Sequence, residues 1–132
     1  MRIYTSYFGV INKVKAKYHG KVGLIDIARF GDKYGQCDFR FADIAPSEKL
    51  LRDYKSNSID EKQYSVRYME EVLKSLDAKK VEIAFKNMCD ALGVEDLVLF
   101  CYEKPNEFCH RHLFAHWFNE NTEYNIAELK IE

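Results

Sequence analysis

Two short runs of the sequence are almost wholly apolar and rich in branched side chains. They are "KVGLIDIAR" at residues 21–29 and "EDLVLFCYE" at residues 95–103. A strand that faces water on one side alternates apolar and polar residues, whereas a strand in a parallel sheet is covered by helices on both faces and shows no such alternation. The two runs therefore predict central strands of a parallel sheet.

The segment between these two strands has the pattern of helices. Apolar residues recur at helical spacing in "EKQYSVRYMEEVLKSL" (61–76), and again from Val81 to Leu92, just before Gly93. Ser47 and Asp60 precede helical stretches and are residue types that cap helix N-termini. A helical insert is therefore expected before the strand at 95–103.

Strands are also expected near both ends of the chain. "RIYTSYF" (2–8) alternates and is rich in β-branched and aromatic residues, and "YNIAELKIE" (124–132) predicts an edge strand that could lie antiparallel. "GVINKVKAKYHG" (9–20) predicts a short helix or turn closed by glycine. The order of elements predicts an α/β fold, an open and mainly parallel sheet flanked by helices. With no repeat or linker, residues 1–132 are expected to form a single domain.

The charge balance of the chain excludes some partners. The 132 residues carry a formal net charge of -1, and the sequence pI is near 6.4. Non-specific nucleic-acid binding and membrane-surface binding need a basic excess that is missing here. The N-terminus has no apolar signal segment and no run is long enough to cross a membrane, so we expect a cytoplasmic protein with its four cysteines reduced.

Residues 30–46 form a long segment without sustained periodicity. It contains two glycines, several aspartates and Pro46. Long loops in compact domains are usually functional or mobile. We expect this loop to be among the more mobile segments and to become ordered when a ligand binds.

The densest chemistry lies in "LVLFCYEKPNEFCHRHLFAHWF" (97–118), where a strand, a turn and a helix follow one another. A helix that begins near Phe108 or Cys109 places Arg111 in its first turn, where the helix dipole disfavours a cation unless an anion is near. That anion could be the carboxylate of Glu103 or Glu107, or a bound phosphate or carboxylate.

Two other interpretations of the same stretch remain open. Zinc ligation would use Cys101 and Cys109 with His112 and His116, but the eight-residue cysteine spacing is wider than in most structural zinc sites, so no metal is expected. Nucleophilic catalysis would use Cys109 at the helix N-terminus with His110 or His112 as its base. The stretch lacks the glycines of a phosphate-cradling loop.

This stretch resembles the signature of the bacterial and phage family known as domain of unknown function 488 (DUF488). The resemblance rests on an apolar strand, a Cys with Glu two residues later, and Cys-His-Arg at the start of a helix. "RIYTSYFG" is similar to the opening strand of the family and "LIDIARF" to its second strand. The resemblance implies a small α/β domain with its motif residues gathered at one end of the sheet. In this sequence those residues are Thr5, Ser6, Asp26, Arg29, Cys101, Glu103, Cys109, His110 and Arg111.

These residues lead to a first hypothesis, a small domain that binds a phosphorylated, nucleotide-like ligand at the carboxyl edge of its sheet. Arg29 and Arg111 would hold phosphate, and the aromatic residues near the strand ends, Tyr7, Phe30, Tyr34 and Tyr102, could stack on a base. Such a domain could sequester a signalling nucleotide. No cofactor is expected.

Two alternatives belong to other classes. In one, the protein is a hydrolase or glycosidase acting on a nucleotide or a nucleic-acid-derived substrate, with Glu103, and secondarily Asp26, as general acid or base. Cys109 is the other catalytic candidate. In the second alternative, the chain is a protein-interaction module that uses residues 30–46 and the helical insert as its surface.

Overall fold

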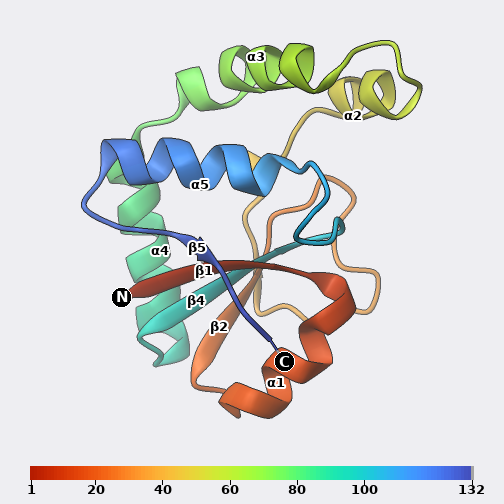
Figure 1. Ribbon diagram of the computed structural model, residues 1–132. Coiled ribbons are helices and arrows are strands. Elements are labelled where there is room, and N and C mark those ends of the chain that lie inside the picture. The colour runs from red at the N-terminus through yellow and green to blue at the C-terminus, as the bar shows by residue number, and fades with distance from the viewer. Residues whose placement is uncertain (132) are drawn as a thin grey trace.

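The computed structural model describes residues 1–131 and contains a five-stranded sheet in which every pairing is parallel (Figure 1). The strand order is β3-β2-β4-β1-β5. The strands are β1 (Arg2–Tyr7), β2 (Val22–Asp26), β3 (Phe39–Arg40), β4 (Asp96–Cys101) and β5 (Ala127–Glu128). The prediction of an α/β fold with an open, parallel sheet is confirmed.

The two apolar runs form the neighbouring strands β2 and β4 near the centre of the sheet. All five residues of β2 are buried, and in β4 only Asp96 is partly exposed. Gly23 allows close packing here, because a Cβ atom at this position would lie 2.7 Å from a methyl carbon of Leu97 and 2.8 Å from one of Leu92.

The two short edge strands differ from the sequence-based expectation. β3 lies inside residues 30–46, which were predicted to be a loop, and it pairs with the end of β2. β5 is an edge strand, as predicted, but it runs parallel to β1 and has only two residues. Strands this short carry no recognisable alternation, so their pairing depends on contacts that are distant in sequence.

The helices follow the predicted order. They are α1 (Ile11–Tyr18), α2 (Glu48–Lys55), α3 (Glu61–Glu71), α4 (Ala78–Leu92) and α5 (His110–Asn121). The Ser47 side chain accepts a hydrogen bond from the Leu50 amide, and Asp60 forms a capping box with Gln63, so both predicted N-caps are confirmed. The predicted helix over 61–76 is shorter: it ends at Glu71 and is followed by a 3-10 turn, Leu73–Ser75.

Helices cover both faces of the sheet, with α1 on one face and α4 and α5 on the other (Figure 1). Val98 and Phe100 of β4 pack in the cluster that includes Ile11 and Val14 of α1. Leu97, Leu99 and Cys101 point to the opposite face and join the main core, which includes Phe85, Phe114 and Phe118. The alternation of β4 therefore directs Cys101 towards α5.

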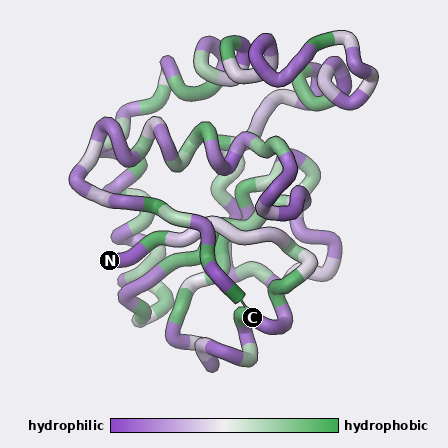
Figure 2. The backbone as a smooth tube through the Cα atoms, viewed as in Figure 1, coloured by the Kyte–Doolittle hydropathy of each residue, from purple (hydrophilic) through white to green (hydrophobic). Residues whose placement is uncertain are grey.

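The pair α2 and α3 forms an outer layer over α5 (Figure 1), and hydrophilic residues alternate with hydrophobic ones along its backbone (Figure 2). Tyr64 and Tyr68 are the buried residues of α3, and their rings lie against Phe108 and His110. The helical insert thus encloses the start of α5 from the side away from the sheet. Among residues 1–131, no helix combines the length and the hydropathy needed to cross a bilayer.

Candidate functional site

The predicted site residues come from the carboxyl ends of β1, β2 and β4 and from the start of α5. In the sheet register, Ser6 lies opposite Phe100, Tyr7 opposite Cys101, and Asp26 also opposite Phe100. The strand ends therefore meet at one edge, on the right in Figure 1. Cys109 is the N-cap of α5, so the Cys-His-Arg motif begins the helix as the sequence predicts.

Arg111 is the most enclosed charged residue of this edge, with a side chain that is 0% exposed. Its Nη1 donates to the Cys101 sulfur at 2.9 Å and to the Glu103 carbonyl oxygen at 2.6 Å. Burial alone would lower the pKa of the guanidinium, but the hydrogen bonds to Glu128 and Cys101, together with the nearby sulfurs, raise it above its ordinary value. Arg111 therefore stays charged inside the protein.

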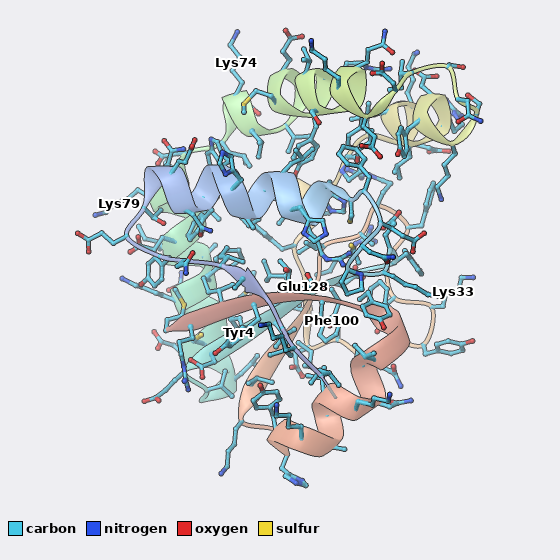
Figure 3. The ribbon with its side chains drawn as sticks, viewed as in Figure 1. Tyr4, Lys33, Lys74, Lys79, Phe100 and Glu128 are labelled. Carbon is cyan, nitrogen blue, oxygen red and sulfur yellow. The ribbon has the colours of Figure 1, made fainter. Side chains whose placement is uncertain are left out.

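The anion that Arg111 requires is supplied by Glu128. Nε and Nη2 of Arg111 donate to the two carboxylate oxygens of Glu128 at 3.0 and 3.1 Å, a bidentate pair. Thr5 Oγ1 donates to the same carboxylate at 2.7 Å, and Figure 3 shows Glu128 between β1 and α5. The sequence predicts an anion here and names Glu103, Glu107 or a ligand, but the carboxylate comes from β5.

Cys101 and Cys109 lie next to each other at this edge. Their sulfur atoms are 2.6 Å apart, both residues are buried, and both carry free thiols. Burial, followed by the contact with Cys101, raises the pKa of the Cys109 thiol far above its ordinary value. At neutral pH Cys109 is therefore a thiol, and the activated thiolate predicted for the helix N-terminus is disfavoured.

His110 continues this chain of contacts towards β2. Its Nε2 lies 2.9 Å from the carbonyl oxygen of Ile27, and its Nδ1 lies 3.7 Å from the Cys109 sulfur. A carbonyl oxygen can only accept, so the proton is on Nε2 and Nδ1 carries the lone pair. Burial lowers the pKa of His110 to about 4, which keeps the ring neutral. Hydrogen bonds and sulfur contacts thus run from Thr5 through Glu128, Arg111, Cys101, Cys109 and His110 to Ile27.

The side chains of Asp26 and Arg29 form hydrogen bonds to backbone groups of the segment that follows β2. The Asp26 carboxylate accepts hydrogen bonds from the amides of Ala28 and Asp32 at 2.9 and 2.8 Å. The Arg29 Nε donates to the carbonyl oxygen of Pro46 at 2.7 Å, so this guanidinium faces the start of the helical insert and not Arg111. Arg40, which the sequence did not single out, donates to the carbonyl oxygens of Ala28 and Arg29.

Three polar groups near this edge have no hydrogen-bond partner among residues 1–131. The Oγ of Ser6 and the Nε2 of His112 are buried and unpartnered. Burial, followed by the charge of Arg111, lowers the pKa of His112. The carboxylate of Glu103 is half-buried and, within the described chain, takes part in no hydrogen bond or ion pair; its backbone carbonyl is the part that Arg111 contacts.

The zinc set weighed from the sequence is not assembled. His116 is exposed and its Nε2 lies 3.1 Å from Glu120, and His112 is outside the cysteine cluster. Among residues 1–131, the potential ligands that come together are Cys101, Cys109 and His110, whose ligating atoms lie within 4.8 Å of one another.

Glu128 is the residue of this network that the sequence analysis missed. The only local signal is an acid within the predicted edge strand "YNIAELKIE". Its role depends on the register of β5 with β1, which places Glu128 beside Thr5.

Residues 25–122 match the family described as the active DUF488-N3 subclade (DUF488-N3a). No curated protein and no solved structure matches the chain. The family match includes the end of β2, all of β4 and the Cys-His-Arg start of α5, so it covers most of the chain and the greater part of the hydrogen-bonded network. The protein therefore belongs to the DUF488 family.

Proposed function

We propose that the protein binds a phosphorylated, nucleotide-like small molecule at the carboxyl edge of its sheet. The observation that carries this proposal is a group of exposed aromatic side chains on the loops that follow β2 and β4. Phe30 is 64% exposed, Tyr34 is 84% exposed and Tyr102 is 40% exposed. Flat rings are the groups on which a nucleobase stacks.

The loops that carry these rings are held next to each other. The hydroxyl group of Tyr102 donates to the carbonyl oxygen of Gly31, and its ring lies edge-on to Phe8 with centroids 4.8 Å apart. The backbone at Gly31 has a φ of +80°, which favours glycine. The loop after β2 is therefore held against the residue that leaves β4, which supports a binding surface made by both loops.

Two guanidinium groups of the same loop region support phosphate binding. Arg29 is half-buried and Arg40 is exposed, and the hydrogen bonds of both go to backbone carbonyl oxygens. Within residues 1–131 neither guanidinium forms a salt bridge, so neither is in direct contact with a carboxylate of the described chain. Lys33 projects from the same loop at the edge of the molecule (Figure 3). A phosphate is a natural counter-ion for such a group.

Arg111 has a different part in this proposal from the one that the sequence predicts. All three of its nitrogen atoms donate to groups of the chain itself. Its charge is balanced by Glu128, so we assign phosphate contact to Arg29 and Arg40 instead. We place the binding reaction in the cytoplasm, where free thiols such as those of this chain persist.

The test is incubation of the purified protein with a panel of nucleoside mono-, di- and triphosphates, followed by denaturation and chromatography. We expect one class of nucleotide to be retained by the folded protein and recovered intact. The matched nucleosides without phosphate should be retained at least tenfold less well, because they lose the charged contact. Equal retention of nucleotide and nucleoside, or retention of neither, would contradict the proposal.

One observation favours a second candidate, an enzyme that cleaves the same class of ligand. Of the carboxylates at this edge, Asp26 and Glu128 are fully engaged with the chain, whereas the Glu103 carboxylate has no partner among residues 1–131. A free, half-buried carboxylate is suited to general acid or base chemistry. The matched subclade is itself described as active. Fragments of the nucleotide in the same chromatogram, and their loss in Glu103→Gln, would favour this candidate.

A further inference from the structure

The sulfur atoms of Cys101 and Cys109 are the only pair of thiols in contact within residues 1–131. They lie 2.6 Å apart, which is closer to the bond length of a disulfide, about 2.05 Å, than to the separation of two thiolates on a tetrahedral zinc ion, about 3.8 Å. A bond between the two sulfurs therefore needs a smaller displacement than the insertion of a metal ion. The geometry favours redox chemistry over metal binding.

The surroundings distinguish the two sulfurs. Cys101 accepts a hydrogen bond at 2.9 Å from the guanidinium of Arg111, a donor that stabilises negative charge as it develops on this sulfur. Cys109 receives no such contact from that side chain, and burial holds it as a neutral thiol. Cys101 is therefore the better candidate for the sulfur that reacts first, and Cys109 for the sulfur that then attacks the oxidised Cys101.

His110 supplies the proton acceptor that the second step needs. Its Nε2–H donates to the Ile27 carbonyl oxygen, so its Nδ1 carries a lone pair, 3.7 Å from the Cys109 sulfur. The ring cannot turn over without breaking the bond to Ile27. The nitrogen that can take a proton is therefore held next to the thiol that must lose one.

The co-reactant must be small, because Cys101 is 1% exposed and Cys109 is 3% exposed. A large disulfide or a partner protein could not reach either sulfur. Tyr64 and Tyr68 of the helical insert lie over the start of α5, whereas the turn that joins Cys101 to Cys109 is largely exposed, at Tyr102 and residues 104–107. Local opening of a short exposed turn costs little free energy compared with unfolding, and it would admit a molecule of the size of hydrogen peroxide.

We propose that Cys101 and Cys109 form a dithiol site that reduces a hydroperoxide and becomes a disulfide between β4 and α5. The Cys101 sulfur attacks the terminal peroxide oxygen as its thiol proton leaves, the O–O bond breaks, and the alkoxide or hydroxide takes up that proton and departs as alcohol or water. Cys101 is then a sulfenic acid. Cys109 attacks this sulfur, its proton passes to Nδ1 of His110 and on to the leaving hydroxide, and water departs. The peroxide gains two electrons, and each sulfur gives one. This chemistry is independent of the proposed nucleotide site.

The test uses the reduced full-length chain and hydrogen peroxide, followed by thiol blocking in denaturant and cleavage after glutamate. Cleavage after Glu82, Glu95, Glu103, Glu107 and Glu120 puts Cys89 in peptide 83–95, Cys101 in peptide 96–103 and Cys109 in peptide 108–120. We expect peptides 96–103 and 108–120 to become covalently linked, with consumption of one equivalent of peroxide, and a thiol reductant to separate them. Persistently unlinked peptides, or linkage that involves Cys37 or Cys89 instead, would overturn the proposal.

Variants test the order of the two steps. Cys109→Ser should stop the reaction at a Cys101 sulfenic acid that dimedone labels, whereas Cys101→Ser should leave Cys109 unlabelled. Cys89→Ser, which changes a buried thiol elsewhere in the core, is the matched control and should link as the parent chain does. Sulfenic acid on Cys109 in Cys101→Ser would reverse the assigned roles. One zinc ion per purified chain, released only when thiols are alkylated, would show a metal site instead.

Discussion

The carboxylate of Glu128 neutralises Arg111 across the carboxyl edge of the sheet. The contact joins the last strand to the first turn of α5 by two hydrogen bonds of 3.0 and 3.1 Å, and Thr5 adds a third to the same carboxylate. A cation in the first turn of a helix is otherwise unfavourable. The pair therefore fixes both the two-residue strand β5 and the start of α5.

Removal of this carboxylate should destabilise the fold. Glu128→Ala leaves a guanidinium that is 0% exposed without its counter-ion, whereas Glu128 itself is 24% exposed, so water can replace part of the contact. We expect a loss of about 3 kcal/mol in the free energy of unfolding, at the lower end of the range for breaking a buried pair. Urea unfolding at neutral pH measures the change.

Glu123→Ala is the matched control, because Glu123 is an exposed acid a few residues before β5. It should change the free energy of unfolding by less than about 0.5 kcal/mol. If Glu128→Ala lowers the free energy of unfolding no more than the control does, the Arg111–Glu128 pair contributes no more than an exposed ion pair. Arg111 would then be free to accept another anion.

The features predicted from the sequence are those with a local cause. Uninterrupted apolar runs identify β2 and β4, and capping residues identify the starts of α2 and α3, because each pattern lies within a few neighbouring residues. The need of Arg111 for an anion also follows from its place in a helix. The anion itself does not, because Glu128 reaches it through a strand pairing between residues more than a hundred positions apart.

The contact between Cys101 and Cys109 could not be predicted from the sequence, for a related reason. The two residues are separated by a turn whose course depends on where α5 packs, and that is decided by Phe114 and Phe118 against the core. Arg40 was missed because β3 has no alternation to reveal it. Sequence patterns predict which residues gather at this edge, whereas the contacts that each residue makes there depend on tertiary packing.

His110 should make stability depend on pH. Its pKa is lowered to about 4 in the folded protein, whereas a histidine in an unfolded chain titrates near 6.5. Between these values the unfolded chain binds a proton that the folded chain does not. The free energy of unfolding should therefore be fully retained above about pH 6.5 and fall as the pH drops, by about 1 to 1.5 kcal/mol between about pH 7.5 and 5.5.

The measurement is urea unfolding at the two pH values, for the parent chain and for His110→Asn. Asparagine can keep a donor towards the Ile27 carbonyl oxygen but does not titrate, so most of the decrease should disappear. His112, whose pKa is also lowered, should leave a residual decrease of the same sign. An unchanged pH dependence in His110→Asn would mean that the buried ring is not its source.

The loop at 30–46 should lose mobility when the ligand binds. Its first half is held at Gly31 by Tyr102 and at Asp32, whose carboxylate accepts hydrogen bonds from the amides of Tyr34, Gln36 and Cys37. Lys33 and Gly35 between these anchors are exposed. We expect hydrogen exchange in residues 30–46 to slow at least severalfold on addition of a retained nucleotide. Residues 61–71 of α3 provide the internal reference. Unchanged exchange in the loop would count against its part in binding.

The last prediction distinguishes Arg40, which we propose contacts the phosphate, from Arg111, which the sequence alone places there. Arg40 is exposed and has no carboxylate partner in residues 1–131, so Arg40→Ala should leave the free energy of unfolding within about 1 kcal/mol of the parent value and weaken nucleotide binding by about 1.5 to 3 kcal/mol. Arg40→Lys should recover part of that affinity, since an ammonium group keeps the charge but not the planar, two-pronged contact.

Arg111→Ala should behave in the opposite way, because its guanidinium contacts only groups of the chain. We expect a loss of stability and little change in the affinity of the molecules that remain folded, measured by nucleotide titration well below the unfolding midpoint. Arg52→Ala, at an exposed arginine of α2 whose contact is with Glu48, is the control for loss of surface charge alone. If Arg111→Ala weakens binding while Arg40→Ala does not, the phosphate lies at the start of α5, as the sequence alone predicts, and displaces Glu128 when it binds.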